Sequence, residues 1–346
     1  MGAITIKDIA KMCGVGVSTV SRAMNNHPDI NPETKQMILD TIEKYEYIPN
    51  NSARNLKRSE SNTIAVLVKG IDNPFLQGMF QIFERQVQKT DYSFIIHRVE
   101  EKEDEIAVAL ELEREKRLKG IIFLGGSFGN SEERMRKMTI PFVLCTVGMT
   151  DSVDKSLYSS ISIDDYKESH RLVSHLCELG HRRIAIISGK IDDESIGKLR
   201  YHGYVQALAD HGIALAPELV RYMKQDLPEY SPENGYAVAK ELLEEGVDFT
   251  ALYVVSDNTA FGACKAILES GKRIPEDYSV AGFDGIKLAR YYHPSLTTMR
   301  QPCEEMAEES IRLLIDLIEG RKENQHKTFK AELLEGESVR KIDSDF

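Results

Sequence analysis

The first part of the chain alternates apolar and polar positions with a helical period. Ile6, Ile9 and Ala10 are spaced i, i+3, i+4, which predicts one apolar face of a short helix. Gly14 and Gly16 follow at once and break this helix. The pattern therefore predicts a short amphipathic helix that ends in a tight glycine turn.

Two further helices are predicted after that turn. One starts at Val17 and has three apolar residues at helical spacing: Val20, Ala23 and Met24. The next has Asn31 as its N-cap and Pro32 in its first position, with one face formed by Met37, Ile38, Thr41, Ile42 and Tyr45. Two short helices joined by a tight turn form a helix-turn-helix, whose second helix enters the DNA major groove.

From residue 63 onward, apolar runs alternate with amphipathic stretches. The runs predict strands at 64–68, 94–96, 120–124, 142–145, 184–187, 251–255 and 279–283. The amphipathic stretches predict helices at 75–90, 103–117 and 165–179. Continuous apolar strands between helices are typical of parallel sheets covered on both faces. The fold class is therefore α/β, with two doubly wound subdomains and a ligand cleft at the carboxyl ends of their strands.

Length and composition add limits to this picture. The chain has 346 residues, of which 42% are hydrophobic and 29% charged, as expected for a globular protein of two or three domains. No apolar run is long enough to span a membrane, and Lys7, Asp8 and Lys11 interrupt any signal peptide. We therefore predict a cytoplasmic protein with no membrane partner.

The five cysteines are far apart in the sequence. No pair has the C-x-x-C spacing of metal or redox sites, so they read as reduced residues of a cytoplasmic protein. We therefore expect neither a metal site nor a cofactor.

Charge is distributed unevenly along the chain. Residues 1–58 contain eight Lys and Arg against six Asp and Glu, a net charge of +2, whereas the whole chain carries −11. A mildly basic head on an acidic body fits a protein that touches DNA at one end only. Because each head offers few phosphate contacts, tight binding calls for two heads and hence a homodimer.

The segment 47–57, Tyr-Ile-Pro-Asn-Asn-Ser-Ala-Arg-Asn-Leu-Lys, follows the three helices. With it, residues 4–60 resemble the headpiece of the LacI/GalR family of bacterial transcriptional repressors. The similarity continues in order through the sequence stretches at 72–75 (Asp-Asn-Pro-Phe), 178–184 (Glu-Leu-Gly-His-Arg-Arg-Ile), 282–284 (Gly-Phe-Asp) and 296–302 (Leu-Thr-Thr-Met-Arg-Gln-Pro). The resemblance implies a helix-turn-helix headpiece, a hinge helix and a body similar to periplasmic sugar-binding proteins.

The resemblance also implies a domain layout. The headpiece would cover residues 1–46, a linker with the hinge helix 47–61, and an effector-binding and dimerisation body 62–346. Within the body, the N-subdomain would comprise about 62–160 and 292–321, and the C-subdomain about 161–291 and 322–346. The chain would then cross between subdomains near Ser160, Tyr291 and Arg321.

For DNA, the start of the second helix supplies the candidates for base contact: Val17, Ser18 and Arg22. Arg22 can donate two hydrogen bonds to one guanine, and Val17 can contact a thymine methyl. The resemblance adds Leu56 as an apolar wedge in the minor groove, with packing on the body as the alternative. It also implies phosphate contacts by Thr5, Thr19, Ser21, Asn25 and Thr34, with capping or simple exposure as the alternative for each hydroxyl. Gly16 departs from the family's usual serine or threonine, which predicts weaker anchoring.

For the effector, candidates lie where strands end or in crossovers. They are Asn73, Phe75, Thr146, Arg200, Ser256, Asp257, Asp284 and Gln301. Arg200 and Asp284 are the strongest of these, although Arg200 could instead pair with an acid and Asp284 could cap a turn. Ser256 and Thr146 stand where relatives often carry asparagine and aspartate, so we expect an effector that is neither a galactoside nor a typical hexose.

Together these features predict a sequence-specific DNA-binding regulator that binds palindromic operator DNA as a homodimer. The resemblance favours a repressor of carbohydrate-utilisation genes under allosteric control by a sugar or sugar derivative. An activator, or a regulator that needs a corepressor, remains the alternative. An enzyme is disfavoured because no G-x-S-x-G, P-loop or H-E-x-x-H motif is present. A transport binding protein is disfavoured by the DNA-binding head.

Overall fold

The computed structural model describes residues 4–24, 27, 29–45, 47, 62–126, 132–148, 153–191 and 196–342. The chain divides into two compact units, Met1–Ser61 and Asn62–Phe346. We call them the headpiece and the body. The predicted hinge helix, with Leu56, lies outside the described residues, as does Asn25.

The headpiece contains three helices: α1 (Ile6–Met12), α2 (Val17–Met24) and α3 (Pro32–Lys44). At the start of α1, the Asp8 carboxylate accepts hydrogen bonds from the Thr5 N–H (2.9 Å) and the Thr5 hydroxyl (2.6 Å). At the start of α3, Asn31 accepts from the backbone N–H groups of Glu33 and Thr34 (2.9 and 3.3 Å). Short polar side chains therefore begin these helices, as the sequence predicts.

One small apolar cluster holds the headpiece together. Ile9 from α1, Val20 and Ala23 from α2, and Ile38 from α3 are each at most 2% exposed. The prediction for α3 was partly wrong, because Met37 and Tyr45 are 41% and 40% exposed. Only a narrow stripe of this helix faces the other two, so its flanking apolar residues remain in solvent. The helix-turn-helix itself is confirmed.

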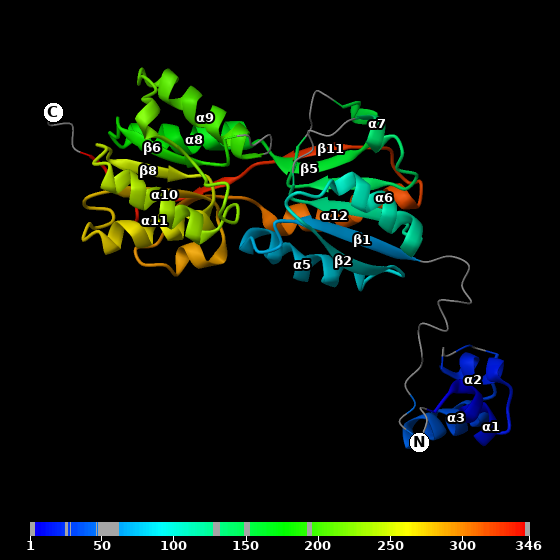
Figure 1. The fold of residues 1–346 in the computed structure, drawn as a ribbon. Helices are drawn as coiled ribbons and strands as arrows, with labels where there is room; N and C mark the ends of the chain where they lie inside the picture. Colours follow the sequence, from blue (N-terminus) through cyan, green and yellow to red (C-terminus); the bar gives the residue numbers. More distant parts are fainter. Residues whose placement is uncertain are drawn as a thin grey trace. The chain divides into compact units, whose positions relative to one another are not determined.

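The body contains two six-stranded sheets, and each defines a lobe (Figure 1). The sheet of lobe 1 has the order β11-β5-β4-β3-β1-β2, and all its neighbouring strands are parallel. Its strands are β1 (Thr63–Lys69), β2 (Ser93–Val99), β3 (Gly120–Leu124), β4 (Phe142–Cys145), β5 (Ser159–Ile163) and β11 (His326–Phe329).

The sheet of lobe 2 has the order β12-β10-β9-β8-β6-β7. It is parallel except for β12, which runs antiparallel to β10. Its strands are β6 (Ile184–Ser188), β7 (Val220–Tyr222), β8 (Ala251–Val254), β9 (Ser279–Asp284), β10 (Thr297–Arg300) and β12 (Glu332–Leu334). The predicted α/β class with two doubly wound parallel sheets is thus confirmed.

Helices cover both faces of each sheet. They are α5 (Pro74–Val87), α6 (Glu105–Lys116), α7 (Glu132–Met135), α8 (Asp165–Glu178), α9 (Ile196–Asp210), α10 (Pro232–Glu244), α11 (Asp257–Glu269) and α12 (Cys303–Ile318), with short 3-10 turns at Lys155–Leu157, Pro217–Leu219 and Lys287–Arg290. In β1, Val66 belongs to the core cluster with α5 and α12, whereas its neighbour Leu67 packs with α6. Both faces of the strand are therefore buried, which explains its uninterrupted apolar sequence.

The chain passes between the lobes three times, and the predicted positions need correction. It leaves lobe 1 after β5, returns between β10 and α12, and leaves again between β11 and β12. These crossovers lie beyond the predicted positions near Ser160, Tyr291 and Arg321. Strands β5, β10 and β11 read Ser-Ser-Ile-Ser-Ile, Thr-Thr-Met-Arg and His-Lys-Thr-Phe, so no apolar run reveals them.

Candidate DNA-binding face and effector site

The predicted base-contact residues of the headpiece lie on the outer face of α2. Val17 is 42% exposed, and Ser18 and Arg22 are also exposed. Val20 and Ala23 point the other way and anchor the helix in the headpiece core. A helix held by its inner face and bearing small, apolar and bidentate side chains on its outer face has the form needed to enter a major groove.

The predicted phosphate-contact residues differ in their availability. The Thr5 hydroxyl is exposed but donates to Asp8, whereas Thr19, Ser21 and Thr34 are half-buried. At the start of α2, the Gly16 carbonyl accepts from the Thr19 and Val20 N–H groups (2.9 and 3.1 Å). Gly16 has no side chain to cap this helix, so only its backbone is available there.

In the body, the carboxyl edges of the two sheets face the same crossovers. Strand β5 ends at the first crossover and β10 at the second, and each lies parallel to its sheet neighbours. The crossover segments run between the two lobes in Figure 1. Side chains that follow β8, β9 and β10 in lobe 2 are therefore gathered at one edge, where ligands bind in open parallel sheets.

Arg200 is the centre of a buried polar cluster at this edge of lobe 2. It lies in α9, is 1% exposed, and donates from Nε to Asp165 Oδ1 (2.8 Å). Its Nη1 donates to the Val255 carbonyl (2.6 Å) and to Asp284 Oδ1 (3.2 Å). Gln301 Nε2 donates to the same Asp284 oxygen (2.9 Å). The structure thus joins Arg200, Asp284 and Gln301, three of the predicted residues, with one that the prediction missed, Asp165.

The guanidinium of Arg200 is only partly satisfied. Its plane lies over the Phe283 ring, with 3.8 Å between Cζ and the ring centroid. Its Nη2 atom is buried and has no hydrogen-bond partner among the described residues. An unpaired buried donor is costly, and a ligand that supplies an acceptor removes that cost.

Burial and charge pairing oppose each other in this cluster. Burial raises the pKa of Asp165 to about 6, although the Arg200 guanidinium opposes the shift. Burial also raises the pKa of Asp284, against the opposing effect of Arg200 and Gln301. For Arg200, burial works against its charge, but the two carboxylates outweigh it and raise its pKa. The pair of acids therefore keeps Arg200 charged inside the protein.

Asp257 has a structural role beside the cluster. Its Oδ1 accepts from the Thr298 hydroxyl (2.6 Å) and its Oδ2 from the Ile286 N–H (2.8 Å). Burial and the nearby Asp284 raise the pKa of this carboxyl well above its usual range. Asp257 thereby ties the start of α11 to β10 and to the loop after β9. Its neighbour Ser256 is also buried, at 1% exposure.

The candidates of lobe 1 are separate from the Arg200 cluster. Asn73 caps α5 by accepting from the Phe75 N–H (3.0 Å), and Phe75 is buried in the core. Thr146 follows β4 with a positive φ of 77°, and its hydroxyl accepts from the Gly125 N–H (3.2 Å). No hydrogen bond between described residues joins these three to Arg200. Capping and packing account for the described contacts of Asn73 and Phe75.

Sequence reasoning missed two acidic residues, Asp165 and Glu101. Asp165 begins α8 directly after β5, so an acid after a polar strand was the only signal for it. Glu101 of lobe 1 lies 3.3 Å from the Lys190 ammonium of lobe 2 and accepts from the Glu229 N–H, also at 3.3 Å. Nothing in the sequence pairs these residues, because they are far apart along the chain.

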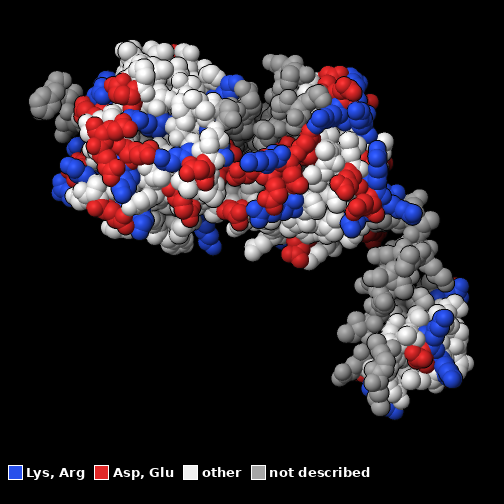
Figure 2. All heavy atoms as spheres, in the orientation of Figure 1, with Lys and Arg blue, Asp and Glu red and all other residues white. Residues whose placement is uncertain are grey.

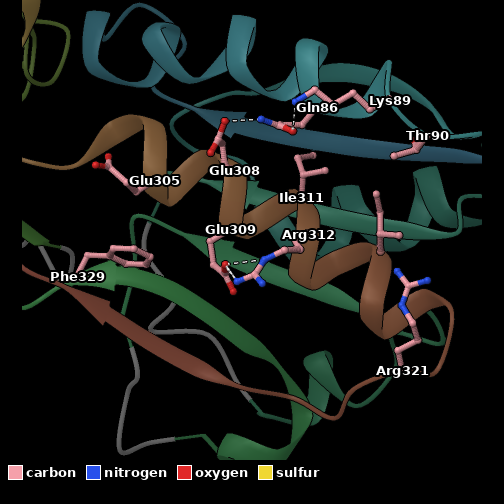
Figure 3. Close-up of a pocket in the computed structure, with 11 residues that line it drawn as sticks. Gln86, Lys89, Thr90, Glu305, Glu308, Glu309, Ile311, Arg312, Arg321 and Phe329 are labelled. Carbon is pink, nitrogen blue, oxygen red and sulfur yellow. Dashed lines mark hydrogen bonds and ion pairs between the residues drawn. The ribbon is translucent and has the colours of Figure 1, made fainter.

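A surface pocket of about 560 Å³ lies elsewhere, between α5, α12 and β11 of lobe 1 (Figure 3). Glu308 accepts from Gln86 there, and Arg312 Nε donates to Glu309 (2.9 Å). Acids and bases are likewise interspersed over the visible face of the body in Figure 2. None of the predicted effector residues lines this pocket, so it is distinct from the Arg200 cluster.

Comparison with known proteins shows to which family this architecture belongs. The pattern "Bacterial regulatory proteins, lacI family" matches residues 5–50, and "Periplasmic binding protein-like domain" matches residues 173–339. The "HTH-type transcriptional regulator MalR" of Clostridium butyricum is 37% identical over 337 residues, which cover 97% of this chain and 99% of that protein. The chain belongs to the LacI family. It is a DNA-binding transcriptional regulator and not an enzyme.

Other LacI-family proteins are similar to this chain along most of its length. The "Ribose operon repressor" of Haemophilus influenzae is 31% identical and covers 92% of this chain and 93% of its own length. A structure titled "transcriptional regulator CelR-cellobiose complex" has a TM-score of 0.71 and 27% identity, over 97% of this chain and 99% of that one. A lac repressor dimer bound to operator and an anti-inducer shares the fold, with a TM-score of 0.78 at 24% identity, over 98% of this chain and 100% of that one.

The described residues contain no helix long and apolar enough to cross a membrane. They also contain no group of three or more His, Cys, Asp or Glu side chains placed to hold a metal ion.

Proposed function

We propose that this protein is a homodimeric, cytoplasmic repressor of carbohydrate-utilisation genes that releases a palindromic operator when a sugar binds at the Arg200 site. The observation that supports the sugar-binding part of the proposal is the buried Arg200 Nη2 atom, which has no hydrogen-bond partner among the described residues and lies at the sheet edge where ligands bind. Relatives named for a ribose operon and solved with cellobiose support a carbohydrate.

In this proposal, Val17, Ser18 and Arg22 of α2 read bases in the major groove, and Leu56 is the minor-groove wedge. Thr5, Thr19, Ser21, Asn25 and Thr34 contact phosphates. Arg200, Asp284 and Gln301 bind the effector from lobe 2, with Ser256 and Asp257 beside them. Asn73, Phe75 and Thr146 contribute from lobe 1.

The regulation follows from linkage. A sugar that prefers one arrangement of the lobes changes the affinity for DNA, and DNA changes the affinity for the sugar by the same factor. Couplings of this kind are typically about 1–3 kcal/mol, or about 5- to 150-fold in affinity. Release of DNA by the sugar identifies a repressor that is induced, whereas tighter binding identifies the corepressor alternative.

The test uses the full-length protein and a palindrome selected from random DNA. Fluorescence anisotropy would measure DNA affinity with and without each sugar of a panel that includes ribose and cellobiose. Arg22→Ala should weaken DNA binding by about 1–3 kcal/mol and relax specificity at one base pair. Arg98→Ala, which removes an exposed body arginine, is the charge-matched control.

A complementary variant tests the effector half. Arg200→Lys should retain DNA binding but lose the response to the sugar, because lysine cannot reproduce the arginine's three directed hydrogen bonds. A purified dimer without preference for any palindrome would overturn the DNA half. A full response in Arg200→Lys would overturn the effector half.

A further inference from the structure

We propose that the Arg200 site selects uncharged polyhydroxylated ligands and rejects phosphorylated or carboxylated ones. This inference rests on the proposed function and narrows its ligand class. Two acidic side chains surround the single guanidinium. Asp165 and Asp284 both contact Arg200 and are each 3% exposed.

The positive charge of Arg200 is therefore already matched twice over. An anionic ligand at Nη2 would place a third negative group beside two buried carboxylates and one guanidinium. Like charges repel one another strongly inside the protein because little water is present to screen them. A hydroxyl group instead offers Nη2 an acceptor without adding charge, and it can also donate to a carboxylate oxygen.

The described lysines at the ends of β1 and β6 are already paired with acids. Lys69 ends β1, lies 3.8 Å from Glu105 and donates to the Glu103 carbonyl (3.0 Å). Lys190, which follows β6 in lobe 2, is paired with Glu101. These lysines are thus committed to acids of the protein, and a phosphate would have to displace one of those acids.

Isothermal titration with matched pairs of ligands tests this selectivity. The probes are ribose with ribose 5-phosphate, glucose with glucose 6-phosphate, and neutral disaccharides with their phosphate esters. For the pair whose sugar binds, we expect the neutral sugar to bind at least about tenfold more tightly than its phosphate ester. Inorganic phosphate should not compete with the neutral sugar. Equal or tighter binding of the ester overturns the inference. Absence of binding by every sugar and ester overturns the proposed carbohydrate function itself.

One variant connects the selectivity to its cause. Asp165→Asn removes one buried negative charge, while its amide oxygen can still accept a hydrogen bond from Arg200. The ratio of the affinity for the neutral sugar to the affinity for its phosphate ester should therefore fall severalfold. The matched control is Asp164→Asn, because Asp164 is exposed and caps α8, and asparagine caps equally well. An unchanged preference in Asp165→Asn would contradict the electrostatic origin.

A second, independent observation concerns the contact between the lobes. One Glu101 carboxylate contacts two separate loops of lobe 2, through the Lys190 ammonium and the Glu229 N–H. The Lys190 side chain is 13% exposed and that of Glu101 is 51% exposed, so the ammonium is shielded from solvent more than the carboxylate. We infer that Glu101 is a clasp that holds the lobes in their ligand-binding arrangement, although it lies outside the Arg200 cluster.

The clasp acts through the equilibrium between lobe arrangements. A contact made only when the lobes are close together favours that state, and the apparent ligand affinity then rises with the fraction of molecules in it. Glu101→Gln should therefore lower sugar affinity about three- to tenfold without altering the ratio between neutral and phosphorylated ligands. High salt should reduce the difference between the variant and the wild type.

Glu100→Gln provides the control, because among the described residues the ion pair of Glu100 lies within lobe 1, with Arg98 (3.1 Å). Hydrogen exchange gives a readout that needs no ligand. The Glu229 amide should exchange faster in Glu101→Ala than in the wild type, and at the wild-type rate in Glu100→Ala. If the exchange of this amide is the same in all three proteins, the clasp does not form in solution and the inference fails.

Discussion

Arg200 and Asp165 form a buried ion pair, with 2.8 Å between Nε and Oδ1, that joins α9 to the first residue of α8. Each side chain is 2% exposed. The pair lies directly after the first crossover, so the residue that holds Arg200 in place also begins the first helix of lobe 2. Asp165 is therefore a positioning residue for the proposed effector site.

This pair predicts a specific dependence of stability on pH. Because burial raises the pKa of Asp165 from 3.8 to about 6, the folded state binds a proton more tightly than the unfolded state does. The stabilisation that this proton provides is complete below the unfolded pKa and is lost as pH rises through about 6. Between pH 5 and pH 7 the loss should be about 1 kcal/mol.

Urea unfolding of the wild type and Asp165→Asn at pH 5, 6 and 7 measures this contribution. Relative to Asp165→Asn, the free energy of unfolding of the wild type should fall by about 1 kcal/mol between pH 5 and pH 7. Asp154→Asn is the control, because hydrogen bonds to Ser156 lower the pKa of Asp154 and its titration lies below this window. A pH-independent difference for Asp165→Asn would contradict the assignment.

The success of sequence reasoning followed the polarity of each strand's sequence rather than its burial, since the unpredicted β5 is as fully buried as β3. Strand β3, Ile121 to Leu124 included, is buried on both faces, and its apolar run predicted it directly. Strands β5 and β11 pair through side chains such as Ser160 and His326, whose hydroxyl and Nδ1 are 2.8 Å apart. Such polar strands have no apolar run, so the hydrophobic pattern did not predict them.

Residues of the candidate effector site were predictable only where a polar side chain stands at the end of a predicted strand. Asp284 and Gln301 follow recognisable motifs at strand ends, and the structure places them on one another. Asp165 and Glu101 act through partners distant in sequence, which no local pattern shows. Asn73 has a polar group that could bind a ligand after β1, but in the structure that group caps α5, and sequence alone does not distinguish the two roles.

Restoring a cap at the start of α2 should strengthen the headpiece. A Cβ at Gly16 would lie 3.5 Å from Ser18 Oγ, which is an ordinary contact, so Gly16→Ser fits without strain. We expect a gain of a few tenths of a kcal/mol in headpiece stability and somewhat tighter DNA binding. Gly14→Ala is the contrasting variant, because Gly14 has a φ of 67° and should lose stability. Thermal unfolding and anisotropy together would measure both effects.

The proposed wedge at Leu56 predicts a loss confined to DNA. Leu56→Ala should abolish tight operator binding, because a minor-groove wedge is needed to hold the bent duplex. Sugar binding measured by calorimetry should stay at the wild-type value. Operator affinity equal to that of the wild type would refute the wedge and favour packing of Leu56 on the body.

Helices α10 and α11 pack so closely that Gly262 should not tolerate a larger side chain. A Cβ at Gly262 would lie 1.8 Å from the Pro232 carbonyl oxygen, so Gly262→Ala must push the two helices apart. We expect a loss of about 1–3 kcal/mol or more in the free energy of unfolding. Gly78→Ala in α5 is the matched control, since its nearest neighbour would be Cys303 Sγ at 3.6 Å. That change should stabilise the protein by about 0.5–1 kcal/mol through helix propensity, and equal effects of the two variants would show that the helices are not in such close contact.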